Sequence, residues 1–182
     1  MPPCTAQALT RPLFTDQDFV PTQFSTAADK AAFANALCRF VAADFREALF
    51  TNRFYQRLSL CFGHIAHGNR EGFAAVFFHD LRGKVAFLEE TLGHPCYGDP
   101  AFTYSDVERA VIARLRAGDV LNTYRARRAA EIDAAERALL AQLRAKYDSI
   151  PIPPCPAPPA APQIVRPRNR HGGQAGEQQS FF

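Results

Sequence analysis

The chain has 182 residues, an ordinary apolar content of 47% and a formal net charge of +3, an excess too small to indicate nucleic-acid binding by electrostatics alone. Its five cysteines are odd in number, scattered and never spaced as C-x-x-C, which excludes a disulfide framework and a cysteine-rich zinc site. No apolar stretch approaches the roughly 20 residues that span a bilayer, and the first residues lack the basic start and apolar run of a signal peptide. We therefore expect a cytoplasmic protein that does not enter a membrane.

Residues 1–25 combine several prolines with isolated phenylalanines, a composition typical of an extended arm that packs on a core. Thr26 and Asp29 predict a helix start, because a side-chain oxygen can accept from the first free amides and an acid suits the positive helix end. From Phe33, apolar residues recur every three or four positions to about Phe50, which predicts the first helix.

The same periodicity predicts further helices over residues 54–65, 70–80 and 82–92. Ser105 and Glu108 have the spacing of a capping box, in which hydroxyl and carboxylate each satisfy an orphan amide. We expect another helix to begin there.

The last predicted helix covers residues 120–147 and is long and charged. One of its faces carries Leu121, Tyr124, Ile132, Ala135, Leu139 and Leu143, so we expect this face to point inward and the alanine-rich second half to pack closely. Residues 26–149 are thus expected to form an all-α bundle of about five or six helices.

Residues 150–182 change character, because repeated prolines exclude helix and favour an extended polyproline linker. The basic segment that follows, with Arg166, Arg168 and Arg170, has too little apolar surface to offset its conformational entropy. We expect a disordered tail whose arginines can assist contact with an acidic partner or a nucleic acid.

The sequence ends in Gln178, Gln179, Ser180, Phe181 and Phe182. This segment resembles the peptide motif by which many bacterial proteins bind the replication sliding clamp: glutamine, an aliphatic residue, serine or aspartate, leucine, phenylalanine. Gln178, Ser180 and Phe182 match that motif, whereas Gln179 and Phe181 replace the aliphatic residue and the leucine. The resemblance covers these five residues only and implies a docking peptide formed by Gln178, Ser180, Phe181 and Phe182.

His64 and His67 are the candidate metal ligands, since positions i and i+3 share one helix face. Further ligands would have to come from elsewhere, with His79, Asp80 and His94 as the candidates. The alternative is that the two imidazoles lie at a helix end, where a positive charge complements the helix dipole.

Catalytic signatures are weak. Cys61 with His64 and Cys96 with His94 are the pairs that could supply a cysteine nucleophile and its base, but neither has flanking residues that make an oxyanion hole. The pair Glu89-Glu90 fits a solvated helix face better than a general acid and base. Enzyme activity is therefore not indicated, and no cofactor is expected.

Arg125, Arg127 and Arg128 form a basic cluster that could contact phosphates or an acidic partner. Acidic residues follow within two turns and offer intrahelical ion pairs instead. The function that these observations favour is a non-enzymatic interaction or adaptor protein, bacterial in character, with a link to DNA metabolism. The alternatives are a metal-dependent helical enzyme or sensor centred on His64 and His67, and a homo-oligomer formed through the 120–147 helix.

Overall fold

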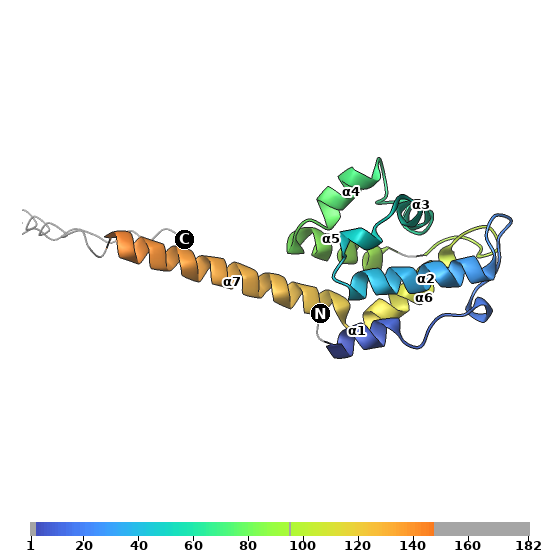
Figure 1. Cartoon of the computed structure of the whole chain (residues 1–182), viewed down its shortest axis with the longest axis horizontal. Helices are drawn as coiled ribbons and strands as arrows, with labels where there is room; N and C mark the ends of the chain where they lie inside the picture. Colours follow the sequence, from blue (N-terminus) through green and yellow to red (C-terminus); the bar gives the residue numbers. More distant parts are fainter. Residues whose placement is uncertain (1–2, 95, 148–182) are drawn as a thin grey trace, which may run out of the picture.

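The computed structural model describes residues 3–94 and 96–147. This part of the chain contains seven α-helices and no strand, which confirms the all-α prediction (Figure 1). Two short 3-10 turns lie in the connections between helices, at Asp16–Asp18 and at Glu47–Leu49. The helices are α1 (Pro3–Thr10), α2 (Ala27–Ala42), α3 (Asn52–Cys61), α4 (Arg70–Phe77), α5 (Leu81–Gly93), α6 (Ser105–Ala117) and α7 (Val120–Tyr147).

Helix α1 corrects the prediction of an arm that is extended throughout, and it brings the helix count to seven. A helix this short is marginal by itself and needs tertiary contacts. Leu9 supplies them, because its side chain is wholly buried and its carbonyl accepts a hydrogen bond from Arg114 Nη1 at 3.5 Å. Gly118 leaves room for it, since a Cβ there would stand 3.3 Å from Leu9 Cδ2.

Both helix starts predicted from capping are confirmed, since α2 begins directly after Thr26 and α6 begins at Ser105, but the predicted cap forms only at Thr26. Thr26 caps α2, with its hydroxyl accepting from the Asp29 amide at 3.1 Å. Ser105 is the first residue of α6 rather than its cap, and its hydroxyl donates to the carbonyl of Gly98 at 2.9 Å. Glu108 is buried, so neither side chain of the predicted capping box caps α6.

The first predicted helix ends earlier than expected, because α2 stops at Ala42 rather than near Phe50. Asp44 and Phe45 have φ angles of 58° and 57°, a left-handed conformation that ends a right-handed helix. The reversal turns the ring of Phe45 into the core, where only 4% of the residue is exposed.

Phenylalanine rings form the centre of the bundle. Phe40 is fully buried, and its ring centroid lies 5.0–5.5 Å from those of Phe45, Phe50, Phe54 and Phe78. Edge-to-face and offset contacts at such distances add to the stabilisation that burial of the rings provides. The phenylalanine-rich composition thus produces one aromatic core that joins α2, α3 and the segment after α4.

Helices α4 and α5 pack against each other with almost no space between their backbones. A side chain at Gly83 would collide with the carbonyl oxygen of Val76 and would stand 3.0 Å from that of Phe77. Only glycine fits this contact, which fixes the start of α5 against the end of α4.

Helix α7 confirms the predicted direction of its apolar face at Tyr124 and contradicts it in its second half. Its first turns are in the core, with Val120 and Tyr124 buried, whereas every residue from 129 to 147 is exposed. Figure 1 shows the reason: α7 continues past the other six helices, so no neighbour among the described residues covers its second half. None of the described helices combines the length and apolar character that crossing a membrane requires.

Candidate functional site

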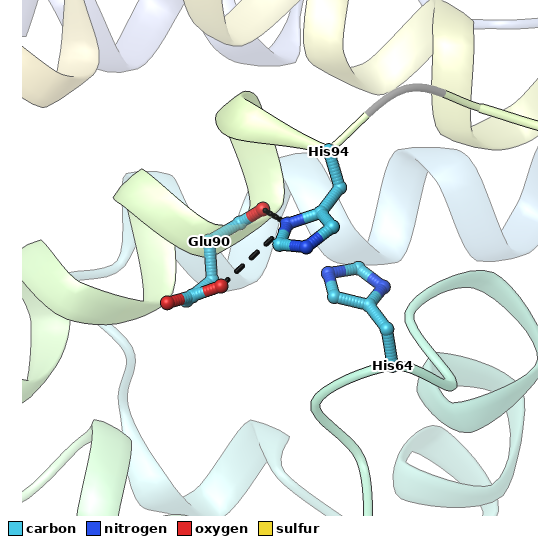
Figure 2. Close-up of side chains that lie close together, drawn as sticks. All are labelled: His64, Glu90 and His94. Atoms are coloured by element: carbon cyan, nitrogen blue, oxygen red, sulfur yellow. Dashed lines mark hydrogen bonds and ion pairs between the residues drawn. The ribbon is translucent and has the colours of Figure 1, made fainter.

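Two histidines and one glutamate from separate elements meet at the surface. Glu90 lies in the last turn of α5 and His94 caps that helix, while His64 comes from the connection between α3 and α4. Their ligand-capable atoms all lie within 4.8 Å of one another, and the two imidazole centroids are 4.0 Å apart (Figure 2). We call these three residues the histidine cluster.

The connection that carries His64 is fixed against α5 by Phe62. Phe62 is fully buried, and its ring centroid lies 6.3 Å from that of Phe87 in α5. Further along, the Tyr55 hydroxyl donates to the carbonyl of Gly68 at 3.3 Å. His64 therefore sits on a segment that is held at both ends, which brings its ring to the end of α5.

The orientation of His94 follows from its contact with the preceding turn. Its Nδ1 lies 2.9 Å from the backbone oxygen of Glu90 and 3.5 Å from the Glu90 carboxylate. A carbonyl oxygen only accepts hydrogen bonds, so Nδ1 carries the hydrogen and, in the neutral ring, Nε2 carries the lone pair.

The pKa of His64 lies below its ordinary value, because partial burial disfavours the imidazolium and the neighbouring His94 adds charge repulsion. At neutral pH its ring is therefore neutral and keeps a lone pair on one nitrogen.

The nearby thiols do not suit nucleophilic chemistry. Burial, reinforced by Glu108, raises the pKa of Cys96 to about 11. Burial also raises the pKa of Cys61 well above its ordinary value. Both sulfurs are thus protonated at neutral pH, whereas a cysteine nucleophile requires the thiolate.

A cavity of about 350 Å³ opens beside His94, between the end of α5 and helix α6. Arg109 and Arg116 line it together with Cys96. Arg116 is fixed there by a hydrogen bond of 2.6 Å to the carbonyl of Leu92. The cavity therefore places positive charge next to the histidine cluster.

Some of the histidines and carboxylates considered in the sequence contribute a ligand atom to the histidine cluster, and others do not. His67 Nε2 lies 2.9 Å from the backbone oxygen of His64, and Asp80 caps α5 by accepting from the Gly83 amide. His94, one of the three candidates for a further ligand, lies beside His64. Glu90 had been assigned to a solvated surface, although its i, i+4 spacing from His94 at a helix end was a signal for a shared site.

Two of the three arginines in the basic cluster of α7 pair with acidic residues of the protein. Arg125 donates to Glu89 of α5 at 2.7 Å, and Arg127 donates to Asp44 at 2.7 Å. Arg128 is half-buried on the same turns. The remaining predicted contact residues lie outside the described residues: Arg166, Arg168, Arg170, Gln178, Ser180, Phe181 and Phe182.

The second half of α7 exposes large apolar side chains on one side of the helix. Their exposed fractions are between 44% and 55%. They are Ile132, Leu139, Leu140, Leu143 and Tyr147, which together we call the leucine face.

Comparisons with protein-family models, with curated proteins and with solved structures found no match for this chain. Function is therefore inferred from the histidine cluster, the leucine face of α7 and the C-terminal sequence.

Proposed function

We propose that this chain is a non-enzymatic interaction protein that pairs with a second copy of itself through α7. The observation that supports this is the leucine face on a helix that extends beyond the body of the protein (Figure 1). Residues 129–147 would extend roughly 28 Å at 1.5 Å per residue. A helix segment of that length gains most of its stability from packing an apolar face, which a partner helix supplies.

The charges of α7 favour an antiparallel arrangement of the two copies. Acidic residues lie toward the start of the exposed segment, at Glu131, Asp133 and Glu136, whereas its end carries Arg144 and Lys146. Antiparallel pairing brings acidic residues near basic ones, whereas parallel pairing aligns like charges.

One antiparallel register aligns four of the five leucine-face residues with one another and leaves Leu143 opposite Glu136. A register with Leu139 opposite Leu140 of the second copy also places Ile132 opposite Tyr147 and Asp133 opposite Lys146. Apolar contact then occurs at the middle and at both ends of the paired segment, flanked by opposite charges.

The first prediction concerns the mass of the protein in solution. Sedimentation equilibrium of the full chain should give twice the monomer mass of 20.2 kDa. Leu139→Glu combined with Leu143→Glu should raise the dissociation constant at least about 100-fold, because each buried leucine contributes roughly 1.5–3 kcal/mol.

The matched control is Ala138→Glu combined with Ala141→Glu, which adds the same charges to the opposite side of the helix and should leave the dimer intact. The antiparallel orientation of the two helices is tested by exchanging charges. Asp133→Lys should weaken pairing, and adding Lys146→Asp should restore it. A monomer at all concentrations, or equal effects of leucine and alanine variants, would refute the pairing.

The C-terminal sequence supports a more specific proposal about what the dimer binds. Gln178, Ser180, Phe181 and Phe182 resemble a sliding-clamp docking peptide, and a dimer would present two copies of it. Two linked peptides bind a multimeric partner more tightly than one, provided that their linkers span the sites.

The second prediction tests that docking peptide directly. A fluorescently labelled peptide of residues 172–182 should bind a bacterial sliding clamp in an anisotropy titration. The same peptide with Phe181→Ala and Phe182→Ala should not bind. Equal anisotropy of both peptides across the titration would remove the clamp as the partner and leave the proposed pairing of α7 untouched.

A further inference from the structure

We propose that His64, Glu90 and His94 bind a divalent transition-metal ion of the Zn²⁺ type. This inference does not depend on the proposed pairing of α7, because none of the three residues lies on that helix. Two imidazoles and one carboxylate are a ligand set that zinc and neighbouring divalent metals accept.

The distances between the three groups suit a single ion. Tetrahedral bonds of about 2.1 Å to nitrogen and oxygen place neighbouring ligand atoms roughly 3.4 Å apart. In the protein each of the three residues has one ligand-capable atom within 4.8 Å of those of the other two, and the side chains of Glu90 and His94 are each 48% exposed. Small side-chain rotations, which solvent permits here, would therefore close the three ligands around an ion.

The backbone already orients one ligand for this task. Histidines that bind a metal almost always donate their other ring hydrogen to a carbonyl or carboxylate, which fixes the ring and the nitrogen that binds. His94 makes this contact through Nδ1 with the carbonyl of Glu90 at 2.9 Å, so Nε2 is the ligand atom. In Figure 2 the rings of His94 and His64 face each other on the same side of α5 as the Glu90 carboxylate.

An ion also gives a physical reason for the close approach of the two imidazoles. Their centroids are 4.0 Å apart and come from segments far apart in the sequence. A metal ion bound to both rings would join the α3–α4 connection to the end of α5.

Three protein ligands leave one coordination position open in a tetrahedral site, as in zinc sites that bind a water or a small molecule from solution. Arg109 and Arg116 in the adjoining cavity favour an anion near that position. The ligand class expected at the open position is thus water or a small anion such as a carboxylate.

The third prediction is tested with the full-length protein after removal of metal by a chelator. Titration with Co²⁺ should produce visible absorption bands that saturate at one ion per chain, and Zn²⁺ should displace them. His64→Ala, Glu90→Gln and His94→Ala should each weaken binding at least about tenfold, since each removes one of three ligands. All three side chains are at the surface, so circular dichroism should be unchanged.

His67→Ala and Glu89→Gln are the matched controls, because they are close neighbours of the cluster that contribute no atom to it. Both should bind Co²⁺ as the unmodified protein does. The proposed site would be overturned if Co²⁺ binding did not saturate, or if the three cluster variants bound Co²⁺ as tightly as the unmodified protein. It would also be overturned by the intense absorption of cysteine–cobalt bonds.

Discussion

Replacing Asp106 with alanine is expected to lower the free energy of unfolding by about 3–5 kcal/mol, because it leaves a charged ammonium group in the interior without its counter-charge. Lys30 is fully buried, and its Nζ lies 3.0 Å from the Asp106 carboxylate. Nζ also donates to the carbonyls of Pro100 and Thr103, each at 2.8 Å. These two carbonyls are dipoles and cannot replace the negative charge of a carboxylate.

Asp106 has a second role that adds to the expected effect. Its carboxylate accepts a hydrogen bond from the backbone amide of Val20 at 2.9 Å. The residue therefore connects the N-terminal segment to α6 as well as balancing Lys30. Loss of the carboxylate removes both contacts at once.

The measurement is urea unfolding monitored by circular dichroism, with Glu89→Ala as the control. Glu89 pairs with Arg125 at the surface, and an exposed pair of this kind contributes at most about 1 kcal/mol. The double variant Lys30→Met with Asp106→Ala should recover much of the stability that the single variant loses. If Asp106→Ala cost no more than Glu89→Ala, the buried ion pair would not stabilise the fold.

The second large effect is expected at Asp44, where Asp44→Ala should cost about 2–4 kcal/mol of unfolding free energy. The Asp44 carboxylate accepts from the Tyr124 hydroxyl at 2.6 Å, from Arg127 at 2.7 Å and from Lys84 at 3.1 Å. Alanine would leave the hydroxyl of a buried tyrosine without this acceptor. It would also occupy a left-handed backbone position, which alanine adopts at a cost.

Asp44→Asn separates the charge of this residue from its shape. Asparagine tolerates the left-handed conformation and keeps one oxygen acceptor, so its cost should be smaller, about 1–2 kcal/mol after allowance for a side chain that is 37% exposed. The difference between the two variants would measure how much the backbone conformation and the hydroxyl contact contribute.

The charge of Asp44 also predicts a pH dependence. Partial burial raises its pKa, but hydrogen bonds from Arg127, Tyr124 and Lys84 lower it more, so the pKa is well below the ordinary value. A depressed carboxyl pKa stabilises the fold above the unfolded pKa of about 4, and this stabilisation is lost as the pH falls further. The stability gap between the unmodified protein and Asp44→Asn should therefore be full at pH 7 and shrink below pH of about 4. A gap that stayed constant down to pH 2 would contradict this.

Local patterns predicted the helices well, because the signals that define them are close in sequence. The Thr26–Asp29 cap locates the start of α2 without knowledge of the fold. The early end of α2 was not predictable in this way. It depends on Asp44, whose left-handed backbone is stabilised by donors from α5 and α7.

Burial on α7 could not be predicted from its own residues. The spacing of Ile132, Leu139 and Leu143 identifies an apolar face, but periodicity contains no information about which element lies opposite. The same applies to the histidine cluster, since only the packing of Phe62 on α5 brings His64 to His94. The sequence correctly predicts that Glu90 is exposed. It does not predict that His64 lies beside Glu90, because tertiary packing brings the two residues together.

The burial of Lys30 makes this protein suitable for chemical labelling. The chain has three lysines, and Lys146 is exposed while Lys30 has no accessible surface. An amine-reactive reagent should therefore modify Lys146 in the folded protein and reach Lys30 only in molecules that have opened. At a fixed reaction time, the ratio of the two modified peptides in a mass spectrum would rise with the fraction of opened molecules, inside cell extracts as well as in purified samples.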